Sequence, residues 1–273
     1  MMMIDVFELV IGWCSDGRQI EGEGLSGNDD EIILFINGIG TPRESVTMMM
    51  TELKRILQHP TIGLHNRSYG VFTDLLFCLI QRDLKLDTIM VRETYKFICG
   101  RLMKDEVKKI MVISHSQGQI ISQIVATQLL STFSNAILQK VSWYSFGGAA
   151  NSFPVPFTGN GRIWGDVEYF VNDGDLIGKL GVLSAIPKEK LKLIEHADQV
   201  PKLLGNHCGR ISIRQNTPGH LLLSHYLAPE KSILDEYQVK QHSGLVKYIN
   251  RHQTTSQEST TGNVDRKGKR KAD

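Results

Sequence analysis

The sequence predicts an α/β fold in which a mainly parallel central sheet carries helices on both faces. Short apolar runs alternate with longer amphipathic stretches along most of the chain, and the run "KIMVI" (109–113) is apolar almost without interruption. Helical stretches of roughly ten or more residues between strands supply the crossover connections that parallel strands need. Near-continuous apolar strands indicate that the sheet is buried on both faces.

The elements of the first half follow from hydrophobic spacing. The run "EIILFING" (31–38) predicts a strand that ends at Asn-Gly. The stretch "PRESVTMMMTELKRILQHP" (42–60) has the spacing of a helix and stops at a proline. Two further helices are predicted in "GVFTDLLFCLIQR" (70–82) and "ETYKFICGRLMKDE" (93–106).

The second half continues the alternation of strands and helices. Its predicted elements are the strand "KKIMVIS" (108–114), the helix "GQIISQIVATQLLSTF" (118–133), the strand "KVSWYSFG" (140–147), a Gly/Ala/Pro-rich loop (147–156), the strand "DVEYFVN" (166–172), a helical region around "KEKLKLIEHADQV" (188–200) and the strand "GRISIRQ" (209–215).

Polar residues collect where the predicted strands end. In an open parallel sheet, reactive groups lie beyond the carboxyl ends of the strands. The predicted loops at these ends are "NGIGT" (37–41), "SHSQG" (114–118), "NDGD" (172–175) and "NTPGH" (216–220). One edge of the sheet is therefore expected to collect a serine, carboxylates and a histidine, in that chain order.

The stretch "IMVISHSQGQI" (110–120) passes from a predicted strand to a predicted helix without a longer loop, which places Ser116 at a sharp apex. A hydroxyl there projects outward, and the N–H groups that begin the helix stabilise developing negative charge. The alternative interpretation of Ser116 is a helix N-cap. The strand-turn-helix context and the acid and base downstream favour a nucleophile.

This pattern resembles the α/β-hydrolase family, in which a G-x-S-x-G elbow joins a strand to a helix and the triad follows in the order Ser, Asp, His. The resemblance covers about residues 31–245. In detail, "FINGIGTPRES", "HNRSYGVFTDLLFCLIQRDL", "SHSQGQII", "SFGGAANSFP", "NDGDLIGKLGVLS" and "GHLLLSHYL" are similar to fungal lipase-like proteins described as DUF676-like. The chain departs from the motif at Ser114, which replaces the first glycine. Serine is small, so we expect it to fit in this turn, although the strained backbone makes it less favourable than glycine.

The resemblance implies the other two members of a triad. A serine hydroxyl needs a base to take its proton, and His220, which follows a predicted strand and a Pro-Gly turn, matches the base of the family. His225 is the alternative base. The acid that orients the imidazole is expected at Asp175, which matches the acid loop of lipase-like relatives. Asp173 is then an exposed turn residue.

The oxyanion hole is expected to consist of backbone N–H groups. One belongs to Gln117, the residue after the nucleophile, and the other to Ile39 in "NGIG". In lipase-like relatives the second donor follows a His-Gly dipeptide, and Asn37-Gly38 stands in for it here. The alternative interpretation of this segment is a plain glycine turn.

The loop "FGGAANSFPVPF" (146–157) allows two interpretations. Glycine and alanine permit close approach, so the loop can line an acyl pocket whose apolar walls are Phe153 and Phe157. Alternatively, these side chains only pack the loop, since apolar loops beside active sites are common.

Composition fits one large domain with short extensions, because the chain has 273 residues and is 41% hydrophobic. We expect an N-terminal extension over 1–30, an α/β-hydrolase domain over 31–250 and a disordered polar and basic tail over 251–273. A formal charge of +2 argues against whole-surface attraction to nucleic acid. The four cysteines lack metal-ligand spacing, so neither a metal nor an organic cofactor is expected.

The expected function is that of a serine hydrolase that cleaves a carboxylic ester, with lipid esters among the candidate substrates. Two alternatives stay open: a catalytically inactive scaffold that binds protein or lipid, and a thioesterase or acyltransferase that uses the same triad. The N-terminus lacks a basic leader and a cleavage site, and no apolar run reaches the roughly 20 residues of a membrane span. An intracellular, cytoplasmic protein is expected, with peripheral membrane contact open and with nuclear import as the alternative that "RKGKRK" (266–271) suggests.

Overall fold

The computed structural model describes residues 18–20, 30–66, 82–84, 87–154, 163–187, 203–204 and 207–254. The strands are β1 (Arg18–Ile20), β2 (Glu31–Ile36), β3 (Thr61–His65), β4 (Lys109–His115), β5 (Val141–Phe146), β6 (Val167–Gly174), β7 (Leu203–Leu204), β8 (His207–Cys208) and β9 (Arg210–Pro218). The α-helices are α2 (Arg43–Leu57), α4 (Ile89–Leu102), α5 (Gly118–Thr132), α6 (Asn135–Leu138), α7 (Leu176–Leu180) and α9 (Tyr237–His242). Residues 244–254 are also helical. Shorter helical turns are η1 (Val182–Ala185), η2 (Leu222–Tyr226), which is a π-helix, and η3 (Ile233–Asp235).

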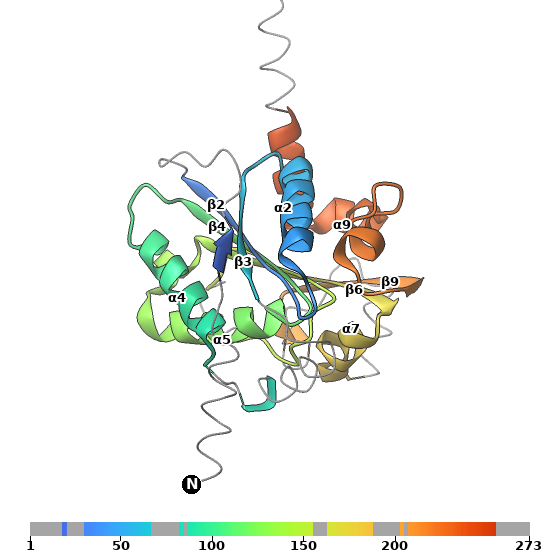
Figure 1. Ribbon diagram of the computed structural model, residues 1–273, viewed down its shortest axis with the longest axis horizontal. Helices are drawn as coiled ribbons and strands as arrows, with labels where there is room; N and C mark the ends of the chain where they lie inside the picture. The colour runs from blue at the N-terminus through green and yellow to red at the C-terminus, as the bar shows by residue number, and fades with distance from the viewer. Residues whose placement is uncertain are drawn as a thin grey trace, which may run out of the picture.

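A seven-stranded sheet forms the centre of the molecule, with the strand order β1-β3-β2-β4-β5-β6-β9 (Figure 1). Only β1 runs antiparallel to its neighbour in this sheet, and the other neighbouring pairs are parallel. The short strands β7 and β8 pair separately. The mainly parallel sheet predicted from the sequence is confirmed.

Helices cover both faces of the sheet because successive strand residues point to opposite sides. In β2, Leu34 and Ile36 belong to one buried cluster, and Ile33 and Phe35 belong to the other. The first cluster includes the buried faces of α4 and α5, and the second includes those of α2 and the helix 244–254. Figure 1 shows α4 and α5 on one side of the strands and α2 on the other.

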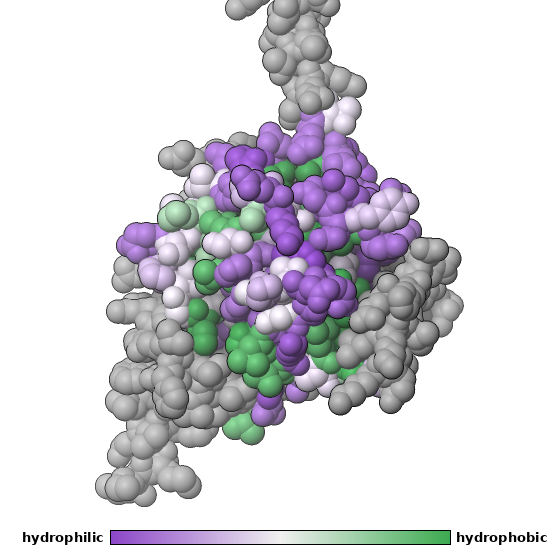
Figure 2. Space-filling model, turned by 90° about the vertical axis from the view of Figure 1, so that its right-hand side faces the viewer, coloured by the Kyte–Doolittle hydropathy of each residue, from purple (hydrophilic) through white to green (hydrophobic). Residues whose placement is uncertain are grey.

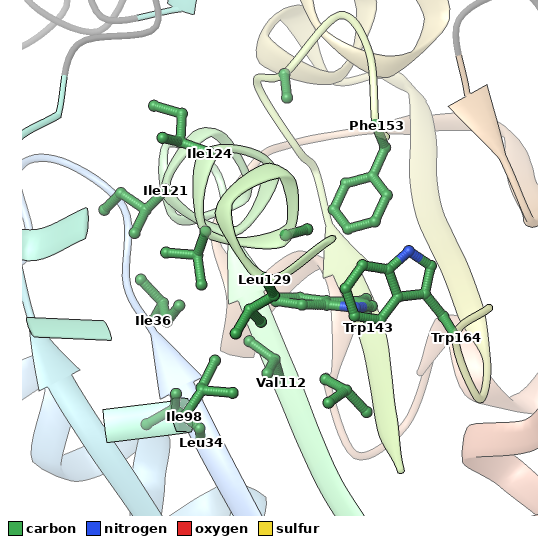
Figure 3. Close-up of a cluster of buried hydrophobic side chains, with 14 of the residues drawn as sticks. Leu34, Ile36, Ile98, Val112, Ile121, Ile124, Leu129, Trp143, Phe153 and Trp164 are labelled. Atoms are coloured by element: carbon green, nitrogen blue, oxygen red, sulfur yellow. The ribbon is translucent and has the colours of Figure 1, made fainter. Parts of the chain in front are cut away.

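Figure 3 shows part of the first cluster, where Ile121 of α5 faces the sheet. Phe153 lies edge-on to Trp143 at a centroid distance of 5.5 Å, and Trp143 meets Trp164 in the same manner at 5.4 Å. Phe153 is only 4% exposed. It therefore packs the core, which is the second interpretation of its loop. Phe157 lies outside the described residues.

The strand β3 was not predicted from the sequence. Its five residues, "TIGLH", contain a glycine and directly follow Pro60, whereas α2 already ends at Leu57. The glycine allows close packing, since a Cβ at Gly63 would lie 2.4 Å from Sδ of Met50 in α2 and would displace that side chain. Gly63 therefore interrupts the apolar pattern of β3 at the position where α2 packs closely on the strand.

Several element boundaries differ from the predicted ones. β1 lies within the segment expected to be an extension and pairs with β3. The final helix runs to residue 254, past the expected domain end. α4 begins earlier than predicted because Thr88 caps it, accepting a hydrogen bond from the N–H of Val91 at 3.4 Å. The helices predicted at 70–82 and 188–200 lie outside the described residues, apart from Arg82.

Candidate active site

Ser116 stands between β4, which ends at His115, and α5, which begins at Gly118. Its φ of 58° is left-handed, a region that residues other than glycine seldom adopt. An N-cap residue normally has extended backbone, and the residue that immediately precedes α5 is Gln117. The backbone at Ser116 is therefore that of a sharp strand-to-helix elbow rather than of an N-cap.

Two glycines allow the elbow to close. A Cβ at Gly118 would lie 2.3 Å from the carbonyl oxygen of Ile36, and a Cβ at Gly38 would lie 2.6 Å from the Cβ of Ser116 and 3.1 Å from its Oγ. The N–H of Ser116 donates to the carbonyl of Phe146 at 3.2 Å. The ends of β2, β4 and β5 thus converge on the serine.

Ser114, which departs from the G-x-S-x-G motif, fits the turn. It is buried, and its hydroxyl donates to the backbone carbonyl of Tyr144 on β5 at 3.4 Å. Because the hydroxyl has a partner, the extra polar atom is not left unsatisfied in the core.

The loop after β2 is tied to the residue after the serine. Asn37 is fully buried and donates through Nδ2 to the carbonyl of Gly38 at 2.7 Å, while its Oδ1 accepts from the N–H of Asn66 at 2.8 Å. Nδ2 of Asn66 in turn donates to Oε1 of Gln117 at 2.7 Å. These bonds hold together the two segments that carry Ile39 and Gln117, the expected oxyanion donors. Asn66 was not identified from the sequence because it follows β3, the strand that was not predicted.

Asp175 and His220 come together across 45 residues of sequence, with His220 Nδ1 2.8 Å from Asp175 Oδ2. The carboxylate also accepts from the hydroxyl of Tyr226 at 2.6 Å and from the N–H of Ile177 at 2.8 Å. Burial alone would raise the pKa of Asp175, but the hydrogen bonds from His220 and Tyr226 outweigh burial and hold that pKa below its ordinary value. The carboxylate therefore stays ionised beside the imidazole.

The alternative site residues have other partners. His225 Nδ1 accepts from the N–H of Leu221 at 3.0 Å, so its ring closes its own turn. The carboxylate of Asp173 accepts from the N–H groups of Asn216 at 2.8 Å and Thr217 at 2.9 Å. The structure thus brings Asp175 to His220, and it uses Asp173 to hold the end of β9.

His115 and Gly147 link this pair to the elbow. The ring of His115 packs on that of His220 at a centroid distance of 4.7 Å, and its Nε2 lies 2.7 Å from the carbonyl oxygen of His220. Burial and the charge of His220 lower the pKa of His115 to about 3, so His115 is neutral near pH 7. A Cβ at Gly147 would lie 2.6 Å from Asp175 Oδ2 and 3.1 Å from His220 Nδ1. His220 consequently lies beside the turn that carries Ser116.

Tyr226 is the site residue that sequence reasoning missed most clearly. It belongs to the stretch "GHLLLSHYL", whose two histidines are the candidate bases. The available signal was a tyrosine in an otherwise apolar run, because a buried tyrosine hydroxyl needs a partner. Sequence does not show which partner it takes.

Exposed leucines lie next to the acid and the base along the chain. Leu176 directly follows Asp175 and Leu221 directly follows His220, and both are exposed. Figure 2 views the side of the molecule with α7 and α9 and shows hydrophobic patches between hydrophilic residues.

Within the described ranges, no helix is both long enough and apolar enough to cross a membrane, and no cluster of three or more His, Cys, Asp or Glu side chains is placed to hold a metal ion.

No protein-family model matches the sequence, and a search of curated proteins finds no match. Among solved structures, the chain is similar to a lipase-esterase related protein from Clostridium acetobutylicum (15% identity, 76% of this chain and 93% of the other, TM-score 0.40). It is similar to Est1E from Butyrivibrio proteoclasticus (12%, 86% and 93%, TM-score 0.40) and to alpha/beta hydrolase domain-containing protein 10 from mouse (12%, 74% and 84%, TM-score 0.35). The finer resemblance to fungal lipase-like proteins stays a prediction. The parallel sheet, covered on both faces, and the elbow at Ser116 show that this chain has the α/β-hydrolase fold.

Proposed function

We propose that this protein is a serine hydrolase that cleaves a carboxylic ester through an acyl-enzyme intermediate. The observation that carries the proposal is the contact between His220 and the buried, ionised Asp175, with His220 packed on His115, the residue before a serine with left-handed backbone. A nucleophile, a base and an orienting acid in this arrangement perform acyl transfer on several unrelated folds.

In the proposed reaction, Ser116 Oγ attacks the ester carbonyl carbon while Nε2 of His220 takes the hydroxyl proton. Asp175 orients the imidazole and stabilises the imidazolium that forms. The imidazolium then gives its proton to the departing alcohol as the acyl-enzyme forms. A water molecule attacks the acyl group with His220 again as base, which releases the carboxylic acid and restores the serine.

The oxyanion of each tetrahedral intermediate needs donors that are held in advance. We assign these donors to the backbone N–H groups of Ile39 and Gln117. The support is the chain of hydrogen bonds from Asn37 through Asn66 to Gln117, which fixes the two segments relative to each other.

We further propose that the acyl part of the substrate is apolar, as in a lipid ester, and that the rim of the site contacts a membrane surface that presents it. The support is the exposure of Leu176 (66%), Leu180 (49%) and Leu221 (57%), since large exposed apolar side chains cost hydration free energy unless they meet a partner. Activity that rises with acyl chain length among p-nitrophenyl esters is the expected result. A preference for acetate would contradict this substrate class.

Fluorophosphonate labelling together with ester turnover tests the reaction itself. We expect wild type to label and Ser116→Ala to lose labelling, with turnover falling by about 10⁴- to 10⁶-fold. Ser131→Ala is the matched control, because Ser131 is exposed on α5 and bonds only to its own helix through the carbonyl of Gln128 among the described contacts. A folded wild type that neither labels nor turns over esters would favour the inactive scaffold instead.

A further inference from the structure

The carboxylate oxygen of Asp175 that faces His220 is shared with a second side chain. Oδ2 of Asp175 lies 2.8 Å from Nδ1 of His220 and accepts a hydrogen bond of 2.6 Å from the hydroxyl of Tyr226. Tyr226 is fully buried. Both hydrogen bonds go to the same oxygen, so the bond from Tyr226 weakens the negative charge that this oxygen presents to His220.

The direction of the hydrogen bond follows from the surroundings of the phenol. The oxygen of Tyr226 accepts from the backbone N–H of Asn172 at 3.1 Å, so its own proton is available for the carboxylate. Burial, followed by the charge of Asp175, raises the pKa of Tyr226, so the phenol stays protonated. The hydroxyl of Tyr226 therefore donates to Asp175 throughout the pH range in which His220 changes its protonation.

Hydrogen bonds from β6 and β9 fix the backbone of the segment that carries both His220 and Tyr226. Nδ2 of Asn172 donates to the carbonyl of Gly219 at 3.1 Å. Arg214 on β9 donates through Nε to Oδ1 of Asn172 at 3.0 Å and through Nη1 to the carbonyl of Lys231 at 2.7 Å. With the backbone held at both ends, the position of the phenol is set by the fold and does not depend on substrate.

We propose that Tyr226 is a positioning residue for the acid–base pair: its hydroxyl fixes the rotation of the Asp175 carboxylate and limits how strongly that carboxylate holds a proton on His220. This role rests on the proposed function. A donor to Oδ2 draws negative charge away from the imidazolium, which leaves His220 acidic enough to protonate the departing alcohol. Without the donor, the imidazolium is held more tightly and the free base forms only at higher pH.

The other titratable groups that face the pair do not obscure this effect. In the described part of the chain, the elements packed against the pair contribute His115 from β4 and Arg214 from β9. On the same segment lies His225, whose Nδ1 accepts from the N–H of Leu221 at 3.0 Å and whose ring packs against Gly219. His115 stays neutral because its pKa is about 3, through burial and the charge of His220. Arg214 stays charged because a guanidinium is not deprotonated in proteins. A change in the pH dependence around neutrality on removing the phenol therefore reports on Asp175 and His220.

Tyr226→Phe tests the proposal, with kcat/KM for a p-nitrophenyl ester measured against pH. We expect the acid limb of the profile to move to higher pH by about half a unit to one unit, with kcat reduced several-fold at the plateau. The Cε1–H resonance of His220, assigned through His220→Gln, should titrate over the same higher range. Replacement of Tyr226 by 3-fluorotyrosine, a stronger donor of the same shape, should move the limb to lower pH.

Tyr144→Phe is the matched control. Tyr144 is also buried, and its hydroxyl donates to a carboxylate, that of Asp166, at 3.3 Å. Asp166 precedes β6, whereas Asp175 follows it. This variant loses a longer tyrosine–carboxylate hydrogen bond at the far end of the strand, so its pH profile should match that of wild type.

The outcomes separate the role of Tyr226 from the proposed function. An active wild type whose acid limb is unchanged in Tyr226→Phe, or a loss of rate that is equal at every pH, overturns the role alone. The same shift in Tyr144→Phe also overturns it. A folded wild type that is inactive overturns the proposed function and this role with it. If Tyr226→Phe fails to fold, the fluorotyrosine protein decides, and an unchanged limb there rejects the role.

Discussion

At Gly38 the backbone after β2 passes so close to Ser116 that a single added methyl group becomes a probe of the site. A Cβ there would lie 2.6 Å from the Cβ of Ser116 and 3.1 Å from its Oγ. Gly38→Ala should displace the hydroxyl from the position where the base takes its proton. We expect kcat/KM to fall by about 10²-fold or more, as measured with a p-nitrophenyl ester.

A glycine in α4 supplies the control for this substitution. A Cβ at Gly100 would meet no atom within 4 Å, and alanine is favoured over glycine in a helix by about 1 kcal/mol. Gly100→Ala should keep full activity and a melting temperature at or above that of wild type. Equal activity in the Gly38→Ala and Gly100→Ala proteins would contradict the close approach at Ser116.

At the scale of elements, the segment 219–231 depends on a buried cation without a carboxylate partner among the described contacts. Arg214 donates to Asn172 and to the carbonyls of His225 and Lys231. Arg214→Met removes these donors and should destabilise the fold by about 2 to 4 kcal/mol. In native-state hydrogen exchange, Arg214→Met should speed the exchange of the Leu227 amide, which lies in this segment, relative to wild type. The amides of α5 should change less.

An exposed arginine provides the comparison. Arg55 pairs with Glu52 one turn earlier on α2, and its side chain is 60% exposed. Surface pairs of this kind contribute about 1 kcal/mol or less. Arg55→Met should therefore leave the exchange rates of 219–231 as they are. If Arg214→Met and Arg55→Met changed the exchange rates of 219–231 equally, Arg214 would not stabilise this segment specifically.

The sequence was informative wherever a single stretch of chain carries its own pattern. The apolar run before Ser116 and the apolar helix after it predicted β4, the turn and α5, because burial on both sides leaves a near-continuous hydrophobic signal. The contacts that complete the site are long-range. Tyr226 meets Asp175 from 51 residues away and Asn66 meets Gln117 from 51 residues away, and neither pairing leaves a local periodicity. The roles assigned to the site residues stay predictions until the variants are measured.

At the scale of the whole molecule, two buried histidines make stability depend on pH. Burial, with the charge of His220, lowers the pKa of His115 to about 3, and burial lowers that of His207 to about 4, from 6.5 in both cases. The unfolded chain therefore binds protons below pH 6.5 that the folded protein does not. The stability is fully present above that pH and falls as pH decreases towards 4, by about 1 kcal/mol per pH unit for each histidine.

His207→Phe isolates one of these contributions. The ring of His207 is buried edge-on to Tyr169 at a centroid distance of 5.0 Å, and neither nitrogen has a hydrogen-bond partner among the described residues. Urea unfolding at pH 7, 6 and 5 should show a shallower loss of stability in His207→Phe than in wild type. Glu168, whose pKa burial raises, acts in the opposite direction near pH 5, so the difference between the two proteins is the quantity to compare. Parallel curves would mean that His207 titrates normally in the fold.

The left-handed backbone at Ser116 also bears on how this chain would change over evolutionary time. Glycine adopts such a φ without steric penalty, whereas a serine held there costs about 1 kcal/mol or more. If the hydroxyl had no use, selection for stability would favour glycine at the elbow, because the folded state would lose the strain. Descendant lineages that keep serine at this position would therefore reveal continued selection for the hydroxyl, and lineages that turn to glycine would mark the loss of chemistry in an intact fold.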